Sequence, residues 1–156
     1  MNPTEKPIMI NLLTIIRNDQ SPDYPIQFLT RGMLSLESEG KAVIRYRESI
    51  PDEDSGESIQ ADIRLDLLKD QVTMTRSGDF SNIMVFMPDQ RFEGKYRTPW
   101  GEMNMGIFSR EVHCDIGQNR GAVHLKYQVD FQGNYASTNE LHLEYAAEED
   151  EGEAGV

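Results

Sequence analysis

Apolar and polar residues alternate with period two along most of this chain, and no segment of helical length shows a period of 3.6 residues. The strictest example is residues 59–67, where Ile, Ala, Ile, Leu and Leu occupy every second position. Successive side chains of a β-strand point to opposite faces, so this pattern places one apolar face against a core. The alternation therefore predicts an all-β protein.

Turn residues divide the alternating pattern into about ten short strands. Most connections are short, which forces neighbouring strands to run antiparallel, and a long antiparallel sheet with one apolar face closes into a barrel or folds into a sandwich. We favour a single antiparallel closed β-barrel of about eight to ten strands. The expected strands cover residues 8–16, 28–36, 41–50, 59–67, 72–76, 80–87, 91–98, 102–116, 121–131 and 135–145, with residues 18–25 as a loop.

One expected strand changes phase along its length. Met103, Met105 and Ile107 share one face, whereas residues 108, 112, 114 and 116 share the other. A β-bulge inserts one residue and reverses the phase in this way. We therefore expect a bulge or bend near Gly106.

The chain length of 156 residues fits one domain. We expect the barrel to occupy residues 1–145 and residues 146–156 to form a disordered acidic tail, because this tail has almost nothing apolar to bury. Its acids are Glu148, Glu149, Asp150, Glu151 and Glu153. The net charge of -12 disfavours nucleic acids and anionic membranes as partners, since both would repel the chain.

Several features disfavour secretion, membrane insertion and metal or cofactor chemistry. Cys114 is the only cysteine, which excludes an intrachain disulfide and fits a reducing compartment. The N-terminal residues lack the basic start of a secretion signal, and the apolar run 8–16 is too short to span a membrane. We therefore expect a cytoplasmic protein without a cofactor.

The polar and reactive residues outside the expected core show no catalytic or metal-binding pattern. His113, His124 and His142 alternate with apolar neighbours and should face solvent, and no pair has ligand spacing with a carboxylate on a clear shared face. The acidic loop 51–58 resembles the start of a calcium loop but lacks key ligands. Cys114 is interpreted as a small apolar residue. No nucleophile or phosphate-loop motif is present, so an enzyme is not expected.

Several segments occur in a recognisable order within residues 8–145. They are Val72–Gly78, Met84–Phe86, Tyr96–Gly101, Met105–Phe108, Gly121 with Leu125–Tyr127, and Ser137–Leu141. In this ordered series the chain resembles the YwiB-like proteins of Gram-positive bacteria. The resemblance implies a calycin, or lipocalin-like, barrel and carries no assigned biochemical function. The acidic loop and the acidic tail depart from that pattern.

Three polar residues, Glu48, Arg76 and Asn139, share the phase of the expected inner faces. An unpaired charge is costly to bury, so Glu48 and Arg76 should find each other, an amide, or water at a barrel mouth. One hypothesis is a ligand site in which Arg76 anchors a carboxylate or phosphate group. Its expected apolar enclosure is Tyr46, Met74, Met84 and Phe86, with Trp100 capping the mouth or contacting the ligand.

The alternative is that the same polar residues form a satisfied internal network that fixes strand register. Two functions follow from these two interpretations. The first is a small intracellular barrel that binds an apolar or amphipathic molecule. The second is a structural or protein-interaction module whose barrel is filled by side chains. A cavity that reaches solvent near Arg76 favours the first, and a filled interior favours the second.

Overall fold

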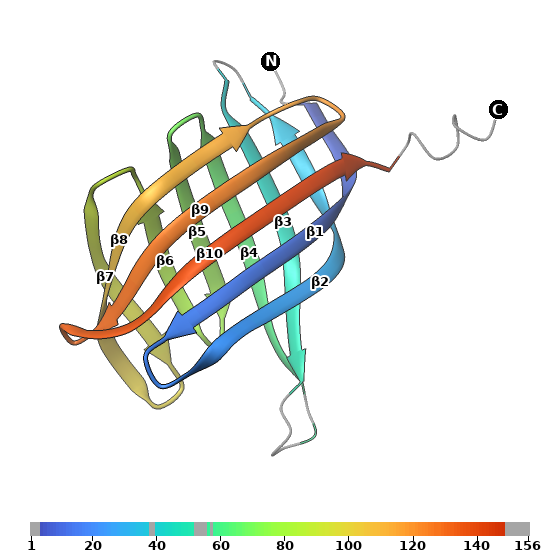
Figure 1. Ribbon diagram of the computed structural model, residues 1–156. Coiled ribbons are helices and arrows are strands. Elements are labelled where there is room, and N and C mark those ends of the chain that lie inside the picture. Colours follow the sequence, from blue (N-terminus) through green and yellow to red (C-terminus); the bar gives the residue numbers. More distant parts are fainter. Residues whose placement is uncertain (1–3, 38–39, 52–55, 57, 149–156) are drawn as a thin grey trace.

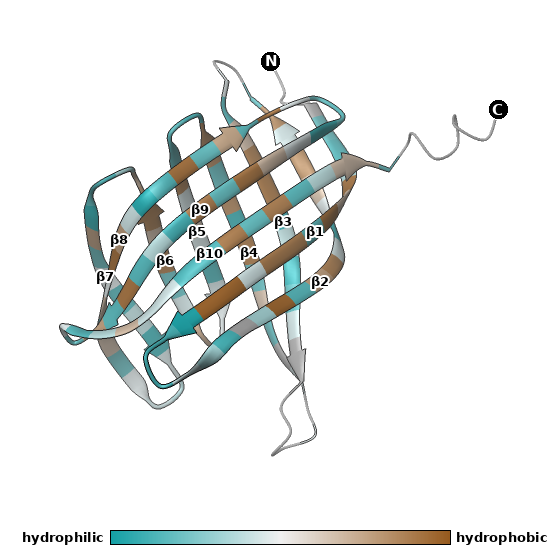
Figure 2. Cartoon of the chain, in the orientation of Figure 1, coloured by the Kyte–Doolittle hydropathy of each residue, from teal (hydrophilic) through white to brown (hydrophobic). Residues whose placement is uncertain are grey.

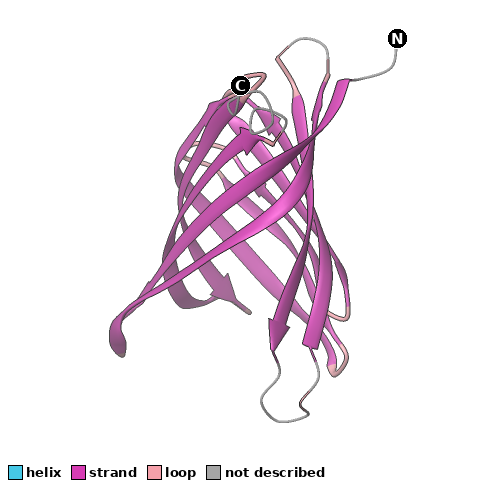
Figure 3. Ribbon diagram, turned by 90° about the vertical axis from the view of Figure 1, so that its right-hand side faces the viewer, coloured by secondary structure: helices cyan, strands magenta, loops and turns pink. Residues whose placement is uncertain are grey.

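The structure is a computed structural model that describes residues 4–37, 40–51, 56 and 58–148. Ten antiparallel strands form one closed barrel, in which each strand pairs with its neighbours in sequence and β1 pairs with β10 (Figures 1 and 3). The predicted fold class is confirmed. The strands are β1 (Thr4–Asn18), β2 (Ser21–Leu36), β3 (Ala42–Pro51), β4 (Ser58–Leu68), β5 (Gln71–Gly78), β6 (Ser81–Phe86), β7 (Arg91–Thr98), β8 (Gly101–Asp115), β9 (Arg120–Phe131) and β10 (Asn134–Ala147).

The up-and-down order places alternate connections at opposite ends of the barrel. We call the end with the β1–β2, β3–β4, β5–β6, β7–β8 and β9–β10 connections the mouth end (lower end in Figure 1). The closed end carries the other connections, the start of β1 and the end of β10. At the closed end Tyr145 is buried, and its hydroxyl donates to the Gly117 carbonyl at 2.8 Å and accepts from the Gly117 N–H at 3.0 Å.

The predicted inner faces form the core. Apolar and polar residues alternate along the strands in Figure 2, as a barrel wall requires when one face is packed and the other is solvated. In β4 the side chains of Ala61, Ile63, Leu65 and Leu67 are all buried. The most deeply buried large side chains are Phe86, Ile8, Ile10, Leu34, Ile44, Ile63, Leu65, Leu67, Ile107, Leu125 and Leu143.

The predicted loop at residues 18–25 is wrong, because β2 begins at Ser21 and Pro25 pairs with Ile15 of β1. Prolines in this region suggested a loop. They are tolerated here because the first part of β2 is an edge: β2 pairs with β3 only from Gly32 to Leu36. At the other end of the barrel β10 continues to Ala147, which is buried, so the barrel extends two residues beyond the predicted boundary.

The expected bulge exists, but it lies at Arg110, between Ser109 and Glu111, and not near Gly106. Both Ser109 and Val112 are buried, which places the phase change between them. Phe108 was assigned to the wrong face because of its hydrophobicity. It pairs with Gln128, and its half-buried ring lies 5.8 Å from the Arg110 guanidinium, in a cation–π contact.

Two neighbouring strand pairs share only short ladders. β2 and β3 are paired through five residues of each strand, Gly32–Leu36 and Ala42–Tyr46, and their mouth-end portions are unpaired with each other. β6 and β7 are paired only through Ser81 and Asn82 of β6. No helix of the described residues is long and apolar enough to cross a membrane.

Candidate ligand cavity at the mouth of the barrel

A cavity of about 660 Å³ lies inside the mouth end of the barrel. This volume falls within the range of about 300–1,000 Å³ that is typical of small-molecule sites. Most of its wall is apolar, and its polar groups are concentrated on β3 and β5. The lining residues are Leu12, Thr14, Ile26, Phe28, Leu29, Thr30, Tyr46, Arg47, Glu48, Ser49, Met74, Arg76, Met84, Tyr127 and Leu141.

The cavity extends to the seam where β2 and β3 separate. Leu29 and Arg47, which alternate with the inward-facing Phe28 and Tyr46, also line it. Leu29 is 68% exposed, so the cavity reaches solvent on this side. Since β2 and β3 pair only beyond this point, their facing edges form an opening in the barrel wall.

Glu48 and Arg76 form an ion pair between Oε1 and Nη1 on the cavity wall, as the inward phase of both residues predicted. Their strands flank β4, where Glu48 pairs with Ala61 and Arg76 with Ile63. The side chains are 14% and 23% exposed, so the pair is half-buried at the mouth. Within the described part of the chain, Glu48 is the sole hydrogen-bond partner of the Arg76 guanidinium.

Two tyrosines surround this ion pair. Burial and the negative charge of Glu48 raise the pKa of Tyr46 well above its usual range, which keeps its phenol neutral. Burial also raises the pKa of Tyr127, while the Asn139 side chain and the charge of Arg76 act in the opposite direction. Asn139 therefore belongs to the same polar group, although it is not one of the cavity-lining residues.

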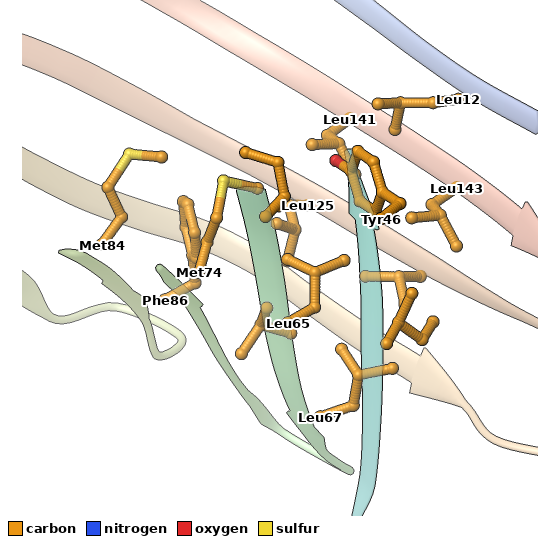
Figure 4. Packing of buried hydrophobic residues seen from close by; sticks show 14 of the residues in the cluster. Leu12, Tyr46, Leu65, Leu67, Met74, Met84, Phe86, Leu125, Leu141 and Leu143 are labelled. Carbon is orange, nitrogen blue, oxygen red and sulfur yellow. The ribbon is translucent and has the colours of Figure 1, made fainter. Parts of the chain in front are cut away.

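The methionines form the apolar wall beside Arg76. Met74 of β5 and Met84 of β6 are directly paired (Figure 4), and both line the cavity. Phe86 was predicted to line it as well. It lies one inward position deeper, is fully buried, and packs edge-on against Tyr127 with ring centroids 4.7 Å apart. Phe86 is thus part of the packed core and not of the cavity wall.

Trp100 does not line the cavity either. Its side chain is 84% exposed in the β7–β8 turn, and its ring packs edge-on against Phe80 at 5.9 Å. Phe80 in turn contacts Tyr96, which contacts Phe131. These rings cover the β7–β9 side of the mouth end, and Trp100 is the exposed end of the series.

The sequence did not identify the cavity residues that β1, β2, β9 and β10 contribute, nor Arg47 and Ser49 of β3. Period two puts most of these side chains on the inner face, but it gives no sign that they line open space. Leu29, Arg47 and Ser49 have the outward phase and line the cavity only where β2 and β3 separate. What separates them from core residues is their position near the mouth end. The missed residues are Leu12, Thr14, Ile26, Phe28, Leu29, Thr30, Arg47, Ser49, Tyr127 and Leu141.

The histidines lie on the outer face, as predicted, but the statement that they share it with no carboxylate is wrong. Glu140 accompanies His142 on the outer face of β10, and their side chains are 3.3 Å apart. His124 lies opposite His142 on β9. One ligand atom from each of these three residues lies within 4.8 Å of the other two.

Cys114 is half-buried, and burial raises its thiol pKa to about 11, so the thiol is neutral near pH 7. This agrees with its interpretation as a small apolar residue. The acidic loop is described only at Pro51, Gly56 and Ser58, and its acids lie outside the described residues. Residues 149–156 of the expected tail also lie outside them.

Comparisons with known proteins identify a family and a fold. A family model described as "Domain of unknown function (DUF1934)" matches residues 10–143. A solved structure titled "Crystal structure of ywiB protein from Bacillus subtilis" is similar, with a TM-score of 0.79 and 18% sequence identity over 94% of this chain and 95% of that chain. At this identity the similarity shows the fold alone. No curated protein matches the chain.

Proposed function

The chain belongs to the family described as Domain of unknown function (DUF1934), and from the geometry of its barrel we propose that it binds a small apolar or amphipathic molecule. One observation carries this proposal. A cavity of about 660 Å³ lies next to the Arg76–Glu48 ion pair and reaches solvent between β2 and β3. A barrel filled by side chains would leave no such space.

The apolar part of the ligand would lie on Met74, Met84 and Leu141. Methionine side chains adapt to different apolar shapes, so this wall favours a loosely specified apolar body. An apolar body displaces water from the wall, and each buried methylene group contributes about 0.8 kcal/mol.

The polar part of the ligand would meet Arg76. A guanidinium carries five N–H donors, and the ion pair with Glu48 uses Nη1. Because Glu48 already compensates the charge of Arg76, a neutral acceptor such as a hydroxyl group is sufficient. A carboxylate would enter only in competition with Glu48.

Isothermal titration calorimetry of the full chain with 1-decanol and with decanoate tests this function. We expect saturable binding of at least one of them, with one molecule per chain. Thr14→Trp, which places a large ring in the cavity, should weaken binding at least tenfold. Ile15→Trp is the matched control, since Ile15 is the next residue of β1 and faces outward, and it should leave the affinity unchanged.

The absence of saturable binding for both ligands would overturn the proposal. Equal affinity of the two tryptophan variants would do the same, because the ligand would then lie outside the barrel. Glu48→Gln adds a test of the polar end. It leaves the Arg76 charge uncompensated, so the ratio of decanoate affinity to decanol affinity should rise.

For the cellular location we propose the cytoplasm. The support is that the chain has a single cysteine, whose thiol is half-buried, so its fold does not depend on a disulfide. Fractionation of the cells that make the protein, followed by immunoblotting, tests this location. Recovery in the medium or the membrane fraction would contradict it.

A further inference from the structure

Three histidines form a row across neighbouring strands on the outer face of the barrel. His124 of β9 pairs directly with His113 of β8 on one side and with His142 of β10 on the other. The rings of His124 and His142 are stacked, with centroids 4.4 Å apart and an interplanar angle of 15°. The rings of His113 and His124 are 6.2 Å apart. His124 and His142 are therefore the closer pair among the three histidines.

Glu140 lies beside this pair of histidines. It precedes His142 by two residues on β10, so both side chains lie on the same face, and its Oε2 is 3.3 Å from the His142 Nε2. One ligand atom from each of His124, Glu140 and His142 lies within 4.8 Å of the other two. Two imidazoles and one carboxylate are a ligand set typical of zinc.

The Glu140 carboxylate is oriented by a second residue. The Arg17 Nη1 donates to Oε1 of Glu140 at 2.6 Å, so Oε2 is the oxygen that faces the histidines. Arg17 also donates to Asp23, which offsets part of its positive charge. Carboxylates that bind metals are commonly held by an outer hydrogen bond of this kind.

One nitrogen of His124 lacks a partner. Its Nε2 is buried and has no hydrogen-bond partner among the residues that the structure describes. A buried polar atom without a partner is costly, and a bound cation would satisfy this nitrogen.

We propose that His124, His142 and Glu140 form a binding site for a divalent transition-metal ion, with Zn²⁺ as the reference ion. Nitrogen ligands favour such an ion over Mg²⁺ and Ca²⁺, which prefer all-oxygen sites. Zinc–nitrogen bonds are about 2.0–2.1 Å long, so the two stacked rings would turn about their side-chain torsions to direct their nitrogens at one ion. This site is separate from the barrel cavity and does not depend on ligand binding there.

Zinc titration of the untagged full chain, in competition with a chromogenic chelator, tests the proposal. We expect one Zn²⁺ per chain, and no competition from a hundredfold excess of Mg²⁺. His124→Gln and His142→Gln should each weaken zinc binding at least tenfold. His113→Gln is the matched control, because His113 belongs to the row but not to the three-residue set, and it should change the affinity by less than threefold.

Cobalt provides a second measurement. Co²⁺ bound by two nitrogens and one oxygen should give visible absorption bands, and these should disappear in the His124→Gln/His142→Gln double variant. The four histidine variants and the native chain are first compared by thermal unfolding without metal, since a surface change should leave the fold intact. No saturable zinc binding by the native chain, or unchanged binding by the double variant, would overturn the proposal.

Discussion

The Arg76–Glu48 ion pair allows the structure to be tested by a double-mutant cycle. Arg76→Leu removes the positive partner and leaves the Glu48 carboxylate, which is only 14% exposed, without its ion-pair partner. Breaking a fully buried pair in this way costs about 3–5 kcal/mol. Because the cavity reaches solvent, we expect the lower cost of about 2 kcal/mol for this variant.

Adding Glu48→Leu should recover part of that loss, because no charge then remains on the cavity wall. The interaction energy of the cycle should be about 1–2 kcal/mol. The exposed pair Arg97–Glu102, whose side chains are 67% and 50% exposed, provides the control cycle. Its interaction energy should stay below about 0.5 kcal/mol.

Urea unfolding followed by circular dichroism measures these energies. Fluorescence is a weaker probe, because Trp100 is already 84% exposed in the folded chain. A loss of about 2 kcal/mol corresponds to a decrease of about 1 M in the urea midpoint for a domain of this size. Two small, additive effects of Arg76→Leu and Glu48→Leu would refute the reasoning, since they would mean that both side chains face water independently.

Three further outcomes follow from the structure. Burial raises the Cys114 pKa from 9.0 to about 11, so its alkylation at pH 8 should be about a hundredfold slower than in the urea-unfolded chain; equal rates would contradict this burial. Tyr145→Phe removes both hydrogen bonds to Gly117 and should lower the free energy of unfolding by about 1–2 kcal/mol in urea, whereas no change would show that water replaces them. Hydrogen bonding to Arg91 lowers the pKa of Asp130 in the folded chain. The ionised carboxylate therefore stabilises the fold at any pH above its pKa in the unfolded chain, and this stabilisation is lost as the pH falls through its lower pKa in the folded chain. Asp130→Asn should flatten that part of the pH–stability curve, and an unchanged curve would contradict the Asp130–Arg91 pairing.

The period-two pattern was sufficient to predict the inner faces and the inward phase of Arg76 and Glu48. Both residues follow apolar side chains of the same phase, and their strands flank β4, whose own pattern is the strictest in the chain. An unpaired charge is costly to bury, so the sequence predicted that each would meet the other, an amide or water, and the structure shows the first of these. The cavity could not, because it depends on where β2 stops pairing with β3.

Strand register explains why the histidine site was missed. Glu140 and His142 share a face by simple alternation, so the carboxylate could have been recognised. The contact with His124 could not, because a register shift between Tyr135 and Ser137 moves β10 by one residue against β9. Without that irregularity His142 would lie opposite Val123. The alternation indicates that some shift is needed, because Val123 faces inward and His142 faces outward, but it does not show in which direction the strand shifts.

Phe108 shows the limit of hydrophobicity as a guide to direction. Its ring is half-buried on the outer face beneath the Arg110 guanidinium, so an aromatic residue in a strand does not have to point into the core. The bulge at Arg110 then restores the inward phase for Val112. The sequence indicates that this strand changes phase. The position of the change depends on the face to which the Phe108 side chain points, and the sequence does not show that face.

The most direct test of the central claim is the methyl spectrum of the methionines during ligand addition. In the full chain labelled with ¹³C at the methionine methyl groups, 1-decanol or decanoate should shift the signals of Met74 and Met84, which line the cavity. The signals of the exposed Met33 and Met103 should stay in place. Shifts confined to Met33 and Met103, or no shifts at all, would contradict a ligand site inside the barrel.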